Sequence, residues 1–455
     1  MFRIEQQKVL RWTSILVVTA VPAFAGEAWG SWAQTGKLTA DDAAGGDYFG
    51  RSVALWGDIA VIGADYAAPG GAAYVFDITT GVQLHKLAVA DGAMYDHFGA
   101  AVGVSDGIVV IGAWGDDDAG DHAGSAYLFD VITGEQLHQL MPDDEYSGSK
   151  FGYAVEINGG VAIVGAPYAH CLFSGAAYLF DVASGQQLAK LTASNYSSHD
   201  HFGSSVAISG DLALVGADSD NDLGGNSGSA YVFDVSDPQK PVEIHKLLAA
   251  DGAPADFFGY RVALSGPIAI VGAYGKDDVG EESGSAYLFN ACSGEQLHKL
   301  VAGDAAAGDE FGRAVAVRGT PEEAIAIVGA PYDGDVADEC GSLYIFDAAS
   351  GQQLKKLIAS DAAMDDLYGW SAAIHGDTIL VGAHSKNGYE SNSGAAYVIE
   401  ACGADVTGDG VIDTLDLLAI IDAWGTADPD ADINGDGIVD VLDLLAVLAG
   451  WGPCE

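Results

Sequence analysis

Two acidic segments near the C-terminus have the residue types and spacing of calcium-binding loops. Each offers oxygen ligands at positions 1, 3, 5, 7, 9 and 12 of a twelve-residue loop, with glycine at the sharp turn. The first loop would use Asp405, Thr407, Asp409, the Val411 carbonyl, Asp413 and Asp416, and the second Asp432, Asn434, Asp436, the Ile438 carbonyl, Asp440 and Asp443. Because calcium binds six to eight such oxygens, the sequence predicts two Ca²⁺ ions.

An apolar stretch follows each of these loops, and its spacing is helical. The first stretch places Leu417, Ile420, Ile421 and Trp424 on one predicted stripe, and the second repeats it with Leu444, Val447, Leu448 and Trp451. Residues 402–455 are therefore predicted to form a small domain of two calcium loops, each leading into a helix. Cys402 and Cys454 bracket this segment, and we expect them to form a disulfide.

The N-terminus has the features of an export signal. Arg3, Lys8 and Arg11 precede a short apolar run that ends in Ala23-Phe24-Ala25, which predicts a signal peptide over residues 1–25. The run is shorter than the roughly 20 residues that a membrane-spanning helix needs. No later segment is long and apolar enough to span a bilayer, so we expect a secreted or cell-surface-associated protein.

The middle of the chain is a repeat of roughly 50 residues, a period typical of propeller blades. Each unit begins at an aromatic-glycine step, and these steps start at Phe49, Phe98, Phe151, Phe202, Phe258, Phe311 and Tyr368. Within a unit, four β-rich phrases are separated by Gly, Asp and Ser turns, which indicates four antiparallel strands. Seven such units predict an all-β, seven-bladed propeller over residues 32–400.

The repeat begins out of phase, which predicts how the ring closes. The seventh unit lacks its fourth phrase, and a matching phrase stands at Thr35–Asp42, before the first unit. We therefore expect the N-terminal strand to complete blade seven.

Charge is strongly unbalanced, with 65 acidic residues against 18 Lys and Arg and a formal net charge of −47. Nucleic acids need a basic footprint, so they are not expected partners. The long connections on one predicted face of the ring are rich in Asp and Glu. Asp218, Asp220 and Asp222 alternate like metal ligands there and form a second, weaker metal hypothesis beside a solvated acidic face.

Four histidines occupy one position of the fourth strand, His85, His138, His245 and His298. They lie on separate predicted blades and cannot converge on one metal, so we interpret them as edge residues that discourage pairing with other sheets. Cys171, Cys292 and Cys340 show no pattern.

The Phe-Gly steps, followed by Gly-Ala-Pro at residues 165–167 and 329–331, resemble the FG-GAP repeats of integrin α-subunit propellers and their bacterial relatives. The resemblance implies a propeller that binds a protein or glycan ligand. The calcium loop that such repeats hold between the two phrases is replaced here by tight turns such as Ile208–Ala213. The family's propeller calcium sites are therefore not expected.

The duplicated calcium loop and helix, with Asp416 and Asp443 at position 12, resembles a type I dockerin of the variety bracketed by cysteines. This resemblance implies a docking partner, either a cohesin-like scaffold protein or another surface-anchoring protein. Dockerins also accompany polysaccharide-degrading enzymes, so the alternative function is a glycosyl hydrolase or lyase, or its accessory subunit, with a site on the acidic face. No catalytic residues stand out, and we expect an interaction or adhesion protein rather than an enzyme.

Overall fold

The computed structural model describes residues 31–144, 147–169, 171–321, 323–388, 391–402, 404, 406, 411–412, 414–426, 431, 433, 438–449 and 452–453. The chain divides into two compact units, one of residues 31–402 with 453–455 and one of residues 1–30 with 403–452. The predicted signal peptide lies outside the described residues.

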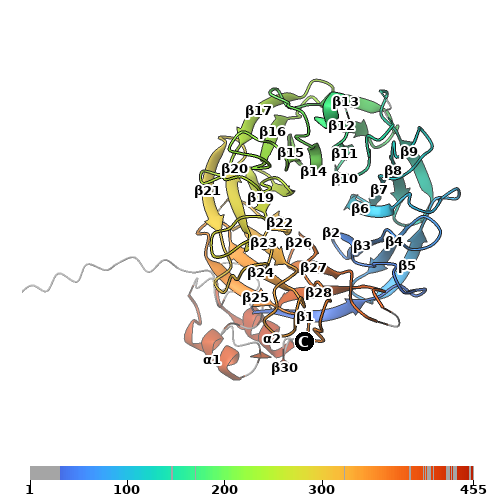
Figure 1. The fold of residues 1–455 in the computed structure, drawn as a ribbon. Coiled ribbons are helices and arrows are strands. Elements are labelled where there is room, and N and C mark those ends of the chain that lie inside the picture. Colours follow the sequence, from blue (N-terminus) through green and yellow to red (C-terminus); the bar gives the residue numbers. More distant parts are fainter. Residues whose placement is uncertain are drawn as a thin grey trace, which may run out of the picture. The chain divides into compact units, whose positions relative to one another are not determined.

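Residues 31–402 form seven four-stranded antiparallel sheets arranged around a central channel (Figure 1). Successive innermost strands contact each other around the ring. The first six sheets consist of β2 (Ser52–Trp56) to β5, β6 to β9, β10 to β13, β14 to β17, β18 to β21, and β22 to β25. This confirms the predicted seven-bladed propeller.

The strands of blades one to three follow the four repeated phrases. Their bounds are β3 Ile59–Ala64, β4 Ala72–Asp77, β5 Val82–Leu87, β6 Phe98–Ser105, β7 Ile108–Ala113, β8 Ser125–Asp130, β9 Gln136–Leu140, β10 Ala154–Asn158, β11 Val161–Ala166, β12 Ala176–Asp181 and β13 Gln187–Leu191. A short 3₁₀ turn, η1, spans Cys171–Phe173.

Blades four to six repeat this arrangement. Their strands are β14 Phe202–Ser209, β15 Leu212–Ala217, β16 Ser229–Asp234, β17 Val242–Leu247, β18 Arg261–Ser265, β19 Ile268–Ala273, β20 Ser285–Asn290, β21 Glu295–Leu300, β22 Ala314–Arg318, β23 Ile325–Ala330, β24 Ser342–Asp347 and β25 Gln353–Leu357.

Blade seven is completed from the N-terminus. Its order is β26 (Ser371–His375), β27 (Thr378–Ala383), β28 (Ala395–Cys402) and β1 (Ser31–Leu38), and β1 pairs antiparallel with β28. Trp32 and Leu38 of the closing strand are each only 4% exposed. The predicted ring closure is confirmed.

The Phe-Gly step has a packing reason. Phe98 is fully buried and packs against Tyr127 and Phe129 of its own blade, at ring-centroid distances of 5.6 and 5.9 Å; the Phe129 contact is edge-on. The next residue, Gly99, has φ +90°, and a Cβ there would lie 2.2 Å from the Ala72 carbonyl oxygen of the preceding blade. Phenylalanine therefore fills the core between blades while glycine lets two blades approach.

The C-terminal unit contains two helices, α1 (Thr414–Asp422) and α2 (Val441–Ala449). Two short strands, β29 (Val411–Ile412) and β30 (Gly452–Pro453), pair with each other. Each helix follows one predicted calcium loop, as the sequence pattern indicates. No helix among the described residues has the length and hydrophobicity to cross a membrane.

Candidate functional site

The structure describes five of the predicted calcium ligands in the C-terminal unit. Val411 lies in β29, Asp416 and Asp443 lie in the first turns of α1 and α2, and Ile438 and Asp440 lie just before α2. Asp416 and Asp443 are both 0% exposed. Buried carboxylates need compensating partners, since isolated charges are costly away from water. These two residues hold the same loop position, the twelfth, where a bidentate carboxylate would approach calcium.

The remaining ligands and the disulfide stay predictions. Asp405, Thr407, Asp409, Asp413, Asp432, Asn434 and Asp436 lie outside the described residues, as does Cys454.

Local hydrogen bonds hold the start of α2 in place. Asp440 caps the helix by accepting from the Leu442 backbone N–H at 2.7 Å, and Asp443 accepts from the Asp440 backbone N–H at 2.8 Å. These two bonds satisfy backbone N–H groups that the first turn of a helix leaves without intrahelical partners. Backbone bonds from Gly425 to the Val439 carbonyl and from Val439 to the Thr426 carbonyl, at 2.8 and 2.9 Å, join the end of the first repeat to the second.

The two helices bury narrower stripes than the sequence predicts. Ile420 and Val447 are fully buried, whereas Ile421 and Leu448 are about half exposed. The latter belong to a second, outward stripe on each helix. We name these stripes the outer apolar faces, consisting of Leu415, Leu418 and Ile421 on α1 and Leu442, Leu445 and Leu448 on α2, with exposures of 47–57%.

The structure gives no support to a metal at Asp218, Asp220 and Asp222. The Lys246 ammonium group lies 2.7 Å from both Asp220 and Asp222, and Asp218 instead faces His201 at 3.6 Å. Burial alone would raise the pKa of Asp220, but its hydrogen bond from Lys246 lowers it overall. A lysine therefore supplies the positive charge that the hypothesis assigned to a metal.

The same network of tyrosine, aspartate and lysine recurs around the ring. In blade six, the Lys356 ammonium group lies within 2.7 Å of Asp304, Asp333 and Asp335, while Tyr344 donates to Asp304 and Asp333. Blade two has Gln139 where the other blades have lysine. In every blade except blade two, a lysine of the outer strand thus pairs with a carboxylate of the long connections.

The four repeated histidines have a role different from the predicted one. The Nε2 atoms of His85, His138, His245 and His298 lie 2.9–3.1 Å from backbone carbonyl oxygens of Ile132, Ala183, Cys292 and Ala349, respectively. Each of these carbonyls belongs to a turn in the following blade. The carbonyl can only accept, so Nε2 donates, and the histidines bond neighbouring blades together.

The channel mouth on the side of the long connections is lined by aromatic and cationic side chains that sequence reasoning missed. Seven residues that precede the aromatic-glycine steps have φ between 51° and 57°, namely Tyr48, His97, Lys150, His201, Phe257, Glu310 and Leu367. This left-handed conformation is uncommon for residues other than glycine. Aligning the seven units would have shown that aromatic residues recur here and after the Gly-Ala phrases.

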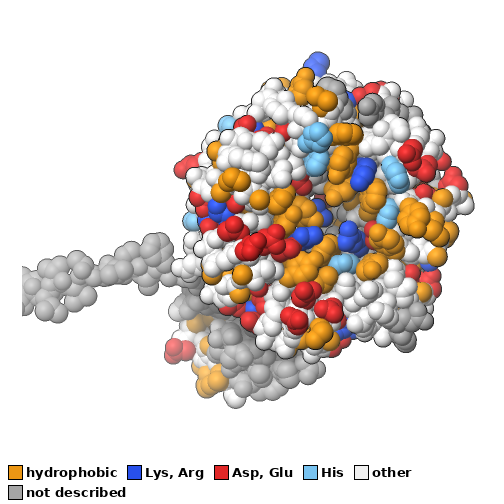
Figure 2. Space-filling view, in the orientation of Figure 1, with side chains coloured by type: hydrophobic (Ala, Val, Ile, Leu, Met, Phe, Trp, Pro, Cys, Tyr) orange, Lys and Arg blue, Asp and Glu red, His pale blue; other side chains and the backbone are white. Residues whose placement is uncertain are grey.

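The residues that follow the same glycines line this end of the channel, which we call the loop end. A cavity of about 150 Å³ is lined there by Arg51, Tyr153, Arg261 and Trp370, with small residues between them. In Figure 2, Lys and Arg side chains gather near the hollow at the centre of the ring, among hydrophobic side chains. Burial and the nearby Arg51 and Arg313 guanidinium groups lower the pKa of His384 to about 3.

Arg313 is the most enclosed of these cations. Its guanidinium carbon lies 4.6–5.9 Å from the ring centroids of Trp370, Tyr274, Tyr260 and Tyr332. It also pairs with Glu310, and its Nε atom is buried without a hydrogen-bond partner. Aromatic rings and the Glu310 carboxylate therefore surround the Arg313 guanidinium group.

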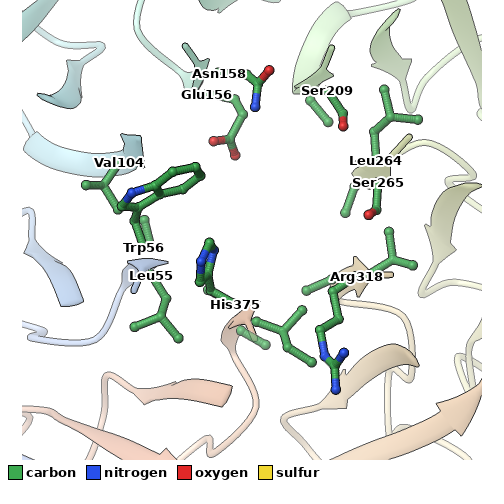
Figure 3. A pocket seen from close by; sticks show the side chains of 18 of the residues that line it. Leu55, Trp56, Val104, Glu156, Asn158, Ser209, Leu264, Ser265, Arg318 and His375 are labelled. Atoms are coloured by element: carbon green, nitrogen blue, oxygen red, sulfur yellow. The ribbon is translucent and has the colours of Figure 1, made fainter. Parts of the chain in front are cut away.

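The cavity at the other end of the channel, the turn end, is larger, and its lining includes both an acidic and a basic residue, Glu156 and Arg318. A cavity of about 500 Å³ opens there among the ends of the innermost strands (Figure 3). Glu156 and Trp56 point into it, and the Trp56 ring lies 4.7 Å from that of His375. Burial raises the pKa of Glu156 to about 7, although the Ile157 backbone N–H donates to it at 3.1 Å.

Glu156 should make the stability of the propeller depend on pH. Its folded pKa lies above the ordinary value of 4.5, so the folded state favours the neutral acid, and stability falls as pH rises from about 4.5 to 7. Glu156→Gln should therefore raise the free energy of unfolding by on the order of 1 kcal/mol at pH 8. Below about pH 4 the variant and the parent should match. Urea unfolding at both pH values tests this, and a difference that is independent of pH would contradict it.

Comparison with known proteins supports the repeat assignment. The family model described as FG-GAP repeat matches residues 32–76, 82–129, 135–180, 186–233, 241–289, 295–346 and 352–399. Each match covers the first three strands of one blade together with the outer strand of the blade before it. No curated protein matches the chain.

Proposed function

This chain belongs to the FG-GAP repeat family, and we propose that it is an exported binding protein whose propeller holds a protein or glycan ligand at the loop end of its channel. The observation that carries the proposal is the ring of aromatic and cationic side chains there. Binding surfaces are enriched in Trp, Tyr and Arg, which offer large contact areas together with polar groups. The long connections of a rigid propeller surround this mouth, and functional residues concentrate in such loops.

We further propose that the C-terminal unit is a dockerin-like anchor that binds two Ca²⁺ ions. Two observations favour this role. Asp416 and Asp443 are buried at matching loop positions, and the outer apolar faces repeat on both helices. An exposed apolar patch rimmed by polar residues is typical of a protein-binding site. The partner would be a cohesin-like scaffold or another surface-anchoring protein, which would hold the propeller near its ligand.

Two tryptophans at opposite ends of the channel provide a matched test of the propeller site. Trp370 lies at the loop end and Trp56 at the turn end. Trp370→Ala should weaken ligand binding by roughly 10-fold or more, as expected for an aromatic residue central to a binding surface. Trp56→Ala should leave the affinity unchanged. The measurement is an array of glycans and extracellular peptides probed with both variants, after their melting curves establish that they are folded.

The outcome that contradicts the proposal is equal loss of binding in both variants, or loss only in Trp56→Ala. Assaying the same samples for release of new reducing ends tests the alternative of a polysaccharide hydrolase or lyase.

A further inference from the structure

Two cations near the loop end have no carboxylate partner within the described residues. Among the described residues, every other Lys and Arg side chain except that of Lys355 lies within 4.0 Å of a carboxylate oxygen. Arg261 instead donates to the Tyr260 backbone carbonyl at 3.2 Å and covers the Tyr260 ring at 4.7 Å. Lys150 lies between the rings of Trp114 and Tyr168, at 4.6 and 4.7 Å.

This lack of partners stands out because the chain has 65 acidic residues. The carboxylates nearest the mouth already have partners. Asp65 lies 3.3 Å from His97 and 4.0 Å from Arg51, Asp218 faces His201, and Glu310 pairs with Arg313. A guanidinium group has five N–H donors, and most of those of Arg261 have no acceptor among the described residues. Arg261 and Arg51 both line the cavity of about 150 Å³, so a small group that enters this space comes next to the Arg261 side chain.

We infer that the loop end of the channel binds a carboxylated sugar residue, a hexuronate at or near the end of an oligosaccharide. This inference rests on the proposed function. The carboxylate meets Arg261, since the planar guanidinium fork matches carboxylate geometry. Tyr153 and Trp370 line the same cavity and add apolar surface against which the C–H groups of a sugar ring can pack. The guanidinium groups of Arg51 and Arg313, 4.9 and 4.6 Å from the Trp370 ring, hold that ring in place.

The surrounding charge restricts the ligand to one or a few acidic groups. The chain carries a formal net charge of −47, and its long connections hold many exposed carboxylates. A densely sulfated polymer lying across this face would be repelled by those loops. One terminal uronate that enters the central mouth meets the cations while the rest of the sugar chain remains neutral. An acidic peptide would offer the same carboxylate without a sugar ring to pack on Tyr153 and Trp370, so its binding is a separate outcome of the test.

The test compares two forms of one trisaccharide on the full-length protein. One form ends in a glucuronate, which is its single charged group, and the other has that carboxylate reduced to the alcohol. Calorimetry should show that the uronate form binds and that Arg261→Gln weakens it by roughly 10- to 100-fold, the loss expected for a charge-assisted hydrogen bond. Arg261→Lys should recover only part of the affinity, because the ammonium group lacks the planar fork. The reduced sugar should bind weakly and equally to the parent and to Arg261→Gln.

Lys355→Gln is the matched control, since Lys355 also lacks a carboxylate within 4.0 Å among the described residues but lies on the outer strand β25. It should bind the uronate sugar as the parent does. Equal affinity for both sugars, or an unchanged affinity in Arg261→Gln, overturns the uronate assignment. If Trp370→Ala still abolishes binding of the reduced sugar, the proposed glycan-binding function survives that result. Binding of an Asp-rich peptide but not of the sugar, or binding of neither, also overturns the uronate assignment.

Discussion

Removing residues 32–40 should destabilise the whole propeller, with a loss of about 5 kcal/mol or more in the free energy of unfolding. The deletion takes away β1, the outer strand of blade seven, and leaves the edge of β28 unpaired. It also removes Trp32 and Leu38, and a fully buried side chain of this kind contributes about 1.5–3 kcal/mol through burial alone. Denaturant unfolding followed by circular dichroism measures the change.

Closure joins the two ends of the ring, so its loss should affect more than one blade. The Lys37 ammonium group lies 2.6 Å from Asp361, and Gln34 accepts from the Ser360 backbone N–H at 3.0 Å; both partners belong to the connection from blade six to blade seven. The exposed edge should also promote association between molecules, which sedimentation would detect.

Substitutions on the same strand provide the control. Trp32→Ala combined with Leu38→Ala should lower stability strongly, whereas Thr35→Ala, at an exposed position of β1, should not. A truncated protein that unfolds at the same denaturant concentration as the parent would show that β1 is dispensable.

The fold follows from the sequence because its repeat is strict. Phe98 and Gly99 show why the step at each unit tolerates little variation, since one fills the space between blades and the other lets backbones meet. The displaced phrase at Thr35–Asp42 predicts β1 as the closing strand because an incomplete blade would leave a free sheet edge. The period of the repeat and its displaced fourth phrase were therefore sufficient to predict the seven blades and the closing strand.

The side-chain partners were not predictable in the same way. His85 bonds to a turn of the next blade, and Lys246 lies between Asp220 and Asp222, and both contacts depend on which way a side chain points across strands. The loop end was missed because its lining comes from residues such as Arg51, Arg261 and Trp370, which lie far apart in the sequence at repeat positions whose residue type varies from unit to unit. Only the closed ring brings them together.

The C-terminal unit should fold only with calcium. Residues 402–455, expressed alone, should be largely unfolded in chelator and should gain helix when calcium is added, with two ions bound per chain. Such a short segment buries too little apolar surface to be stable without a metal or a disulfide. The many carboxylates of each predicted loop would repel each other without a cation, so binding and folding are coupled. Circular dichroism in chelator and in calcium measures the transition.

Substitution of the buried carboxylates should remove the ions one at a time. Asp416→Asn and Asp443→Asn should each leave one ion in calorimetry of the full-length protein, because each removes the carboxylate at position 12 of one loop. Asp422→Asn, which changes an exposed carboxylate at the end of α1, should leave both ions bound.

At calcium concentrations 100 times the dissociation constant, each site adds about 2.7 kcal/mol to the stability of this unit. A spectrum that is indifferent to chelator, or two ions retained in Asp443→Asn, would contradict calcium-coupled folding. Docking through the outer apolar faces should then fail in chelator as well, because the loops hold in place the helices that carry those faces.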